Sequence, residues 1–127
     1  MDSLFLDAFN GIETSRPPVW FMRQAGRILP SYQKLKLKYK FSDLMKSDKL
    51  ASKVTLLPIN DLGVDAAILF SDILVVPESL GLKLEFTDKG PKFHNPLSTV
   101  SNNKKFIFDP KKLNFVYDNI KEIKKKI

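Results

Sequence analysis

A short apolar run in the middle of the chain, AAILF at residues 66–70, constrains the fold more than any other feature. The run does not alternate with polar residues, which is typical of a strand that is covered on both faces, as in a parallel sheet. Periodicity alone leaves a turn of buried helix open as an alternative. We expect a strand, and hence an α/β protein in which this strand needs a parallel partner.

Helical patterns precede this strand. Apolar residues recur at three- and four-residue steps, and each run has a capping residue or a proline near its start. We expect a short helix that begins at Ser3 and ends at Gly11, a helix from Pro30 to about Tyr39, and a helix that begins at Ser47, is disturbed by Pro58 in its last turn and ends at Gly63.

The segment after the strand predicts a small insertion and a long helix. Pro77 and Gly81 bound a helical turn, LKLEF at residues 82–86 alternates as a strand does, and DKGP predicts a turn. Asp109 is a good cap for an amphipathic C-terminal helix, whose apolar side chains are Leu113, Val116, Tyr117, Ile120, Ile123 and Ile127. A strand that leads to a helix is half of a β/α unit, and the sequence has no second strand for this helix to feed.

Composition excludes several classes of function. The chain has 127 residues and no cysteine, which excludes disulfides and thiolate metal sites and favours a reducing compartment. Residues 101–127 carry eight lysines and three acids, so they hold +5 of the net charge of +7. We interpret these lysines as the solvent-exposed face of the last helix. We expect no nucleic-acid partner, because no aromatic residues that could stack on bases are interleaved with the lysines. The first ten residues are not typical of a signal peptide, and no apolar run is long enough to cross a bilayer.

FMRQAGR at residues 21–27 is the strongest candidate binding motif. It holds two of the three arginines, Arg23 and Arg27, in a chain that otherwise uses lysine for eighteen of its twenty-one basic residues. Forked guanidinium groups suit planar carboxylates or phosphates, and Gly26 allows a close approach to the backbone. Ion pairs with acids elsewhere in the fold are the structural alternative. The third arginine, Arg16, lies outside the motif, and we expect its replacement to have a near-neutral effect on substrate handling.

Asp72 follows the predicted strand directly, at the strand end where α/β folds keep their active-site groups. Its alternative role is to cap the backbone of the next turn, and the two roles are compatible. His94 is the only histidine, so we expect no zinc or haem site, and no glycine-rich phosphate loop is present.

Together these segments resemble the uroporphyrinogen decarboxylase family. PVWFMRQAGR, LPSYQKLK, VTLLPI, DAAILFSDILVVPESLGL and KGPKFHNPL occur in that family's order and at its spacing, from about Leu4 to the final helix. The resemblance implies an eight-stranded β/α (TIM) barrel with residues 66–70 as its first strand. It also implies a cytoplasmic homodimer that needs no cofactor or metal and removes the four acetate carboxyls of uroporphyrinogen III to give coproporphyrinogen III in haem biosynthesis.

The resemblance also implies roles for individual residues. Asp72 and Arg23 would be catalytic, with Asp72 accepting hydrogen bonds from the pyrrole N–H groups and Arg23 near the carbon that is protonated. Arg23 and Arg27 would grip the acetate and propionate groups of the substrate. Backbone N–H groups of Gln24, Ala25 and Gly26 would help them. Phe41 is a candidate for the pocket wall, with ordinary core packing as the alternative.

The sequence departs from the family in two respects. Lys36 stands where some members have an arginine, which keeps the charge but loses the fork. The chain resembles only the N-terminal third of the family, so we expect residues 1–127 to form an incomplete barrel, since a barrel takes about 250 residues. The alternatives to a decarboxylase are an inactive remnant and a corrinoid-linked methyltransferase on the same barrel.

Overall fold

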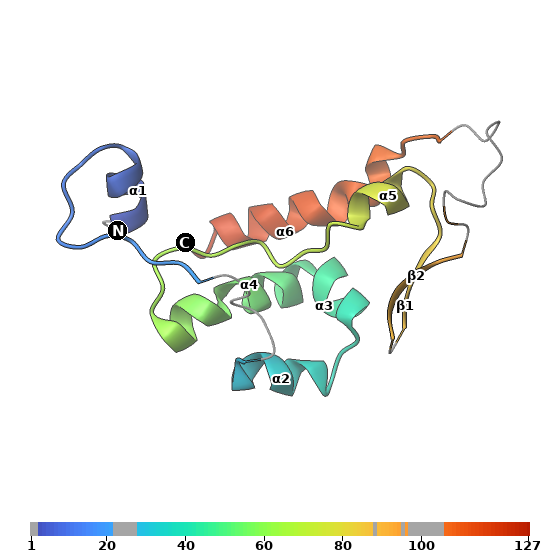
Figure 1. Cartoon of the computed structure of the whole chain (residues 1–127), viewed down its shortest axis with the longest axis horizontal. Coiled ribbons are helices and arrows are strands. Elements are labelled where there is room, and N and C mark those ends of the chain that lie inside the picture. Colours follow the sequence, from blue (N-terminus) through green and yellow to red (C-terminus); the bar gives the residue numbers. More distant parts are fainter. Residues whose placement is uncertain (1–2, 22–27, 88, 95, 97–105) are drawn as a thin grey trace.

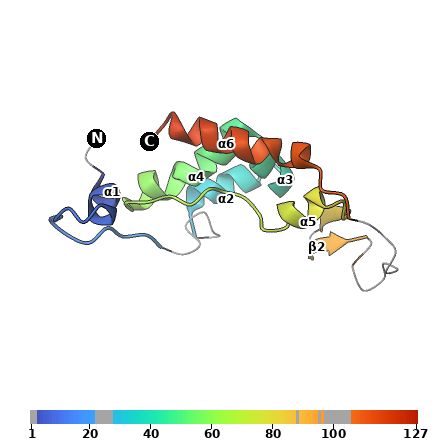
Figure 2. The same ribbon diagram turned by 90° about the horizontal axis from the view of Figure 1, so that it is seen from above.

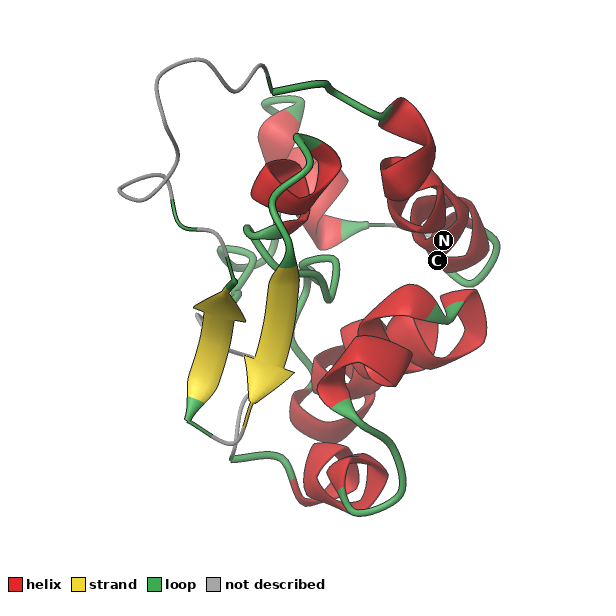
Figure 3. Cartoon of the chain, turned by 90° about the vertical axis from the view of Figure 1, so that its right-hand side faces the viewer, coloured by secondary structure: helices red, strands yellow, loops and turns green. Residues whose placement is uncertain are grey.

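The computed structural model describes residues 3–21, 28–87, 89–94, 96 and 106–127. In the described part, helices pack beside one another and a two-stranded hairpin stands at one end (Figures 1 and 3). In chain order the elements are α1 (Leu4–Phe9), α2 (Pro30–Lys36), α3 (Phe41–Lys46), α4 (Asp48–Leu62), α5 (Val75–Ser79), β1 (Leu84–Thr87), β2 (Gly90–Phe93), the 3-10 helix η2 (Pro110–Leu113) and α6 (Asn114–Lys124).

Local signals place most helix ends where the sequence predicts them. The Ser3 and Ser47 hydroxyls accept hydrogen bonds from the backbone N–H three residues on, at 3.3 and 3.4 Å. Asp109 accepts from the backbone N–H two residues on at 3.0 Å. Gly63 ends α4 with a φ of 66°, a left-handed conformation that favours glycine. Pro58 removes one backbone donor, but α4 continues through it to Leu62.

The core lies where α2, α3, α4 and α6 meet. The sequence analysis did not predict α3, yet its Leu44 and Met45 are fully buried. Leu44 packs in one cluster with Leu29, which precedes α2, and with residues of α2 and α4, namely Tyr32, Val54 and Leu57. Phe41, Leu44 and Met45 stand at positions i, i+3 and i+4, so the helical spacing was present in the sequence.

The apolar side of α6 is only partly covered. Ile123 is buried, whereas Tyr117, Ile120 and Ile127 are exposed by 50%, 41% and 68%. The most buried side chain of α6 is polar: Asn119 is fully buried and donates a hydrogen bond from Nδ2 to the carbonyl of Met45 at 2.8 Å. Its Oδ1 is buried with no hydrogen-bond partner in the described part of the chain.

The predicted strand at residues 66–70 is not formed, which corrects the sequence analysis. The described residues contain one sheet, in which β1 and β2 pair antiparallel from Leu84 with Phe93 to Thr87 with Gly90. Residues 66–70 run as an unpaired trace from the end of α4 towards α5, alongside α4 and α6 (Figures 1 and 2). No described strand lies beside them to complete a ladder, and Ile68 is 59% exposed rather than covered.

The chain exposes more surface than a compact protein of its mass. Its accessible surface is 9578 Å², whereas a folded monomer of 14.5 kDa exposes about 6,900 Å². Apolar side chains are exposed within residues 5–21 and also around α5 and η2, where Ile73, Val76 and Ile107 are exposed by 87%, 54% and 76%. Helices and a hairpin therefore make up an α/β chain with large uncovered apolar faces. In the described ranges, no helix has the length and apolar character to cross a membrane.

Candidate functional site

Part of the predicted site lies outside the described residues, namely Arg23, Gln24, Ala25, Gly26 and Arg27. The chain is anchored on both sides of this motif. Before it, Val19 is hydrogen-bonded to Asp65 in both directions, at 2.7 and 2.9 Å. After it, Leu29 is only 2% exposed and belongs to the core. The arginine motif is thus attached at one flank to the segment that leads to Asp72 and at the other to the helical core.

An ion pair holds the first of these anchors. The Arg16 guanidinium binds both oxygens of Asp65, with Nη1–Oδ2 and Nη2–Oδ1 distances of 2.7 Å, the bidentate geometry that lysine does not provide. The hydrogen bonds from Arg16 and from the Val19 N–H lower the pKa of Asp65 below its usual value. Arg16 therefore makes a structural contact, and the expectation that its replacement leaves substrate handling nearly unchanged stays a prediction. We call the contacts of Arg16 and Val19 with Asp65 the clamp.

Among the described residues, one hydrogen bond holds the chain between the clamp and Asp72, in addition to the packing of the Phe70 ring. The Phe70 N–H donates to Thr55 Oγ1 of α4 at 2.9 Å, and Thr55 is only 2% exposed. In the described part of the chain, the backbone N–H and C=O groups of residues 66–69 have no hydrogen-bond partner. This stretch therefore presents a free edge, anchored at both ends, that a strand can pair with.

Asp72 caps the turn that follows this stretch. Its Oδ1 accepts the Leu74 N–H at 2.8 Å, and its carbonyl lies 3.4 Å from the Val75 nitrogen, which donates to it. This is the capping role that the sequence offered as an alternative. The second carboxylate oxygen has no hydrogen-bond partner among the described residues, and the side chain is half-buried. One oxygen thus fixes the carboxylate, while the other stays available to a ligand.

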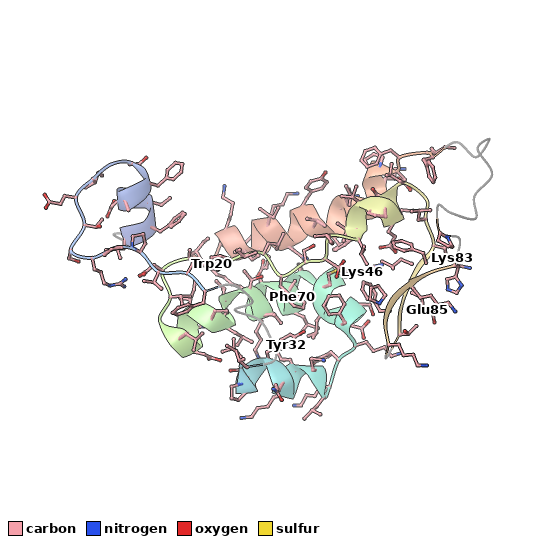
Figure 4. All side chains as sticks on the ribbon, in the orientation of Figure 1. Trp20, Tyr32, Lys46, Phe70, Lys83 and Glu85 are labelled. Carbon is pink, nitrogen blue, oxygen red and sulfur yellow. The ribbon has the colours of Figure 1, made fainter. Side chains whose placement is uncertain are left out.

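Phe41 lies in a row of aromatic rings that joins four segments. Its ring centroid is 5.5 Å from that of Phe70 and 5.0 Å from that of Phe86, and Tyr32 lies 5.8 Å from Phe70 on the other side. Figure 4 shows Phe70 and Tyr32 in the middle of the molecule, between α2 and the crossing trace. These tilted and edge-on contacts are packing contacts, and Phe41 is half-buried. Its predicted role in the pocket wall stays a prediction.

His94 takes part in a surface contact on the hairpin. Its Nε2 lies 2.9 Å from Glu85 Oε2, and its side chain is 42% exposed. The labelled Lys83 and Glu85 mark this end of the molecule in Figure 4. Within the described ranges, no three His, Cys, Asp or Glu side chains lie close enough to hold a metal ion.

Comparison with known proteins gives one consistent result. The family model described as uroporphyrinogen decarboxylase matches residues 1–127. A protein of Thermodesulfovibrio yellowstonii with that name is 50% identical over 123 residues, which is 95% of this chain and 36% of the relative. Relatives of the same name from Sulfurovum sp. and Desulfotalea psychrophila are 46% and 52% identical, over 100% and 76% of this chain and 38% and 29% of their own length. The chain thus spans between a quarter and two fifths of the length of these relatives.

Proposed function

The chain belongs to the uroporphyrinogen decarboxylase family, and from this premise we propose that it supplies the N-terminal part of a β/α barrel that decarboxylates uroporphyrinogen III. In this proposal residues 66–70 are the first strand of the barrel. The product is coproporphyrinogen III, and the chemistry uses the side chains of the protein without a cofactor. The barrel acts as a homodimer in the cytoplasm.

One observation carries the proposal: the free edge at residues 66–69 leads directly to Asp72. Active-site groups of β/α barrels lie at the C-terminal ends of the strands. A parallel neighbour on this edge would pair the free N–H and C=O groups and would cover Ile68, which is 59% exposed. The same pairing would fix Asp72, with its unpartnered oxygen, at the mouth of the barrel.

In the completed barrel the site residues bind the negative charges of the substrate and stabilise the positive charge that develops during the reaction. Arg23 and Arg27 bind carboxylates of the substrate by forked hydrogen bonds, and backbone N–H groups of Gln24 to Gly26 assist them. The unpartnered oxygen of Asp72 accepts hydrogen bonds from the pyrrole N–H groups. Protonation of a pyrrole carbon makes the ring cationic, so it draws electrons from the departing carboxylate, and the nearby anion stabilises that charge as it develops.

The clamp supports this arrangement because it ties together the two segments that carry the site. Val19 lies four residues before Arg23, and Asp65 lies seven residues before Asp72. The relatives described above are all named uroporphyrinogen decarboxylase. Their names support the decarboxylase and do not favour either alternative, the corrinoid-linked methyltransferase or the inactive remnant.

A chimera tests the proposal. Residues 1–127 are fused to the part of the Thermodesulfovibrio yellowstonii relative that follows the matched region, and we call this chimera the completed barrel. Uroporphyrinogen III is supplied in reduced form without oxygen, and coproporphyrinogen is measured. We expect turnover. A chimera that folds, by near-ultraviolet circular dichroism, but does not decarboxylate would overturn the proposal.

Asp72 variants of the completed barrel test the mechanism. Two unit charges 4 Å apart interact by about 4 kcal/mol at an effective dielectric constant of about 20. Loss of that interaction lowers the rate roughly a thousandfold. We expect Asp72→Asn to fold and to lose most of its turnover, and Asp72→Glu to retain more. If Asp72→Asn melts at a lower temperature but turns over normally, Asp72 is a cap and not a catalytic group.

A further inference from the structure

A hollow of about 610 Å³ lies between α2 and α4. It is within the range of roughly 300–1,000 Å³ that is usual for small-molecule sites. Leu29, Leu35 and Leu57 contribute apolar walls, and two of these, Leu29 and Leu57, are 2% and 7% exposed and belong to the core. The hollow therefore has an apolar floor where α2 packs on α4.

Three lysines surround this floor. Lys34 and Lys38 are four residues apart on α2 and its end, so they lie on one side of the helix, and Lys53 comes from α4. In the described part of the chain, none of the three has an acidic partner, whereas Lys46, Lys121, Lys125 and Lys126 all do. The apolar floor thus carries a rim of uncompensated positive charge.

The one carboxylate in the lining does not neutralise these lysines. Asp61 accepts a hydrogen bond from the Ser31 hydroxyl across the hollow. Three positive charges against one negative charge leave an excess of +2. A ligand that suits this surface has an apolar body and at least two carboxylates at its edge.

We propose that the hollow binds an amphipathic polycarboxylate, and that the carboxylated tetrapyrrole is held here. The identity of the tetrapyrrole rests on the proposed function, while the hollow and its charge do not. Ile28, the residue after Arg27, lines the hollow, so a ligand in it lies next to the motif along the chain. Ammonium groups act as point charges without a forked geometry. The lysines therefore attract and retain the polyanion.

The test measures binding of uroporphyrin, with eight carboxylates, and coproporphyrin, with four, to the 127-residue chain. The hollow variant is Lys34→Gln/Lys38→Gln/Lys53→Gln. The control variant is Lys83→Gln/Lys111→Gln/Lys124→Gln. These three lysines lie outside the hollow, and their side chains have no partner among the described residues. Both variants therefore have the same net charge. We expect the hollow variant to bind uroporphyrin about tenfold more weakly than the unmutated chain. We expect the control to change binding less than twofold and coproporphyrin to bind more weakly than uroporphyrin.

An Arg23→Ala/Arg27→Ala background separates this site from the motif. Uroporphyrin binding that persists there and still depends on the three lysines supports the hollow. Equal losses in the hollow and control variants, or equal affinity for both porphyrins, would overturn the inference. Turnover of the completed barrel is scored separately: lysine-dependent binding without turnover rejects the proposed function and leaves the polycarboxylate site in place.

Discussion

Replacement of Asn119 tests how α6 is held on the rest of the core. Asn119 is fully buried, and its Nδ2 donates to the Met45 carbonyl at 2.8 Å. Met45 lies in the last turn of α3, where carbonyl groups have no partner within the helix. The side chain of Asn119 therefore satisfies a buried carbonyl that would otherwise have no donor. Alanine at this position removes the donor, and aspartate replaces it with an acceptor.

The contacts of Asn119 determine how much its replacement lowers the free energy of unfolding. Leaving the Met45 carbonyl unsatisfied costs about 1–3 kcal/mol. Alanine also removes Oδ1, which is itself buried without a partner, so part of that cost is offset. We expect Asn119→Ala to lower the free energy of unfolding by about 1–2 kcal/mol. Asn119→Asp should lower it further, because two acceptors then face each other and a charge is buried.

Urea unfolding followed by circular dichroism measures both variants. The m-value should stay constant, so that a lower midpoint reports stability alone. Asn60→Ala is the matched control, since Asn60 is exposed on α4, and its effect should stay within about 0.5 kcal/mol. The reasoning fails if Asn119→Ala behaves like Asn60→Ala, or if Asn119→Asp is as stable as Asn119→Ala.

Three further predictions concern the arginine motif, the clamp and the chain by itself. In the completed barrel, Arg23→Ala or Arg27→Ala should lower kcat/KM at least tenfold, because a hydrogen bond to a charged group is worth roughly 1.5–3 kcal/mol; Arg27→Lys should not restore it, and equally small effects would show that these arginines are structural. The pKa of Asp65 is lowered in the folded state. Its contribution to the free energy of unfolding is therefore fully present above its pKa in the unfolded chain, about 3.9, and is lost as the pH falls through its pKa in the folded chain. Arg16→Gln should make the free energy of unfolding less dependent on pH below about pH 4, and identical pH profiles would contradict this. The 127-residue chain alone should be inactive, since its free edge and apolar faces stay uncovered; turnover by the chain alone would refute this.

Local chemistry is what the sequence predicts well. The caps Ser3, Ser47 and Asp109 and the left-handed Gly63 each act within a few residues, so their types fix the helix ends that the structure shows. The hairpin follows from alternation and a turn. The motifs identify the family, because the order and spacing of short segments are read directly from the chain.

Long-range contacts are what the sequence does not predict. Arg16 and Asp65 are 49 residues apart, and Asn119 and Met45 are 74 residues apart, so no local pattern indicates either pair. The apolar run at residues 66–70 predicts a strand correctly only if a second strand lies beside it, and the described residues do not provide one. For the site, Asp72 could be located by its place after this run. The hydrogen bond that fixes one of its oxygens was only one of two roles that the sequence allowed.

The backbone contact between Asp109 and Ser79 has a consequence for how the chain tolerates change. The Asp109 N–H donates to the Ser79 carbonyl at 2.9 Å. The two ends of the excursion that contains the hairpin, Ser79 before it and Asp109 after it, are therefore joined directly. Phe86 against Phe41 is the aromatic contact that joins this excursion to α3. Doubling the length of a closed loop costs only about 0.6 kcal/mol. A change in the number of residues between Ser79 and Asp109 therefore adds little to the free-energy cost of closing this loop, while α4 and α6 keep their packing.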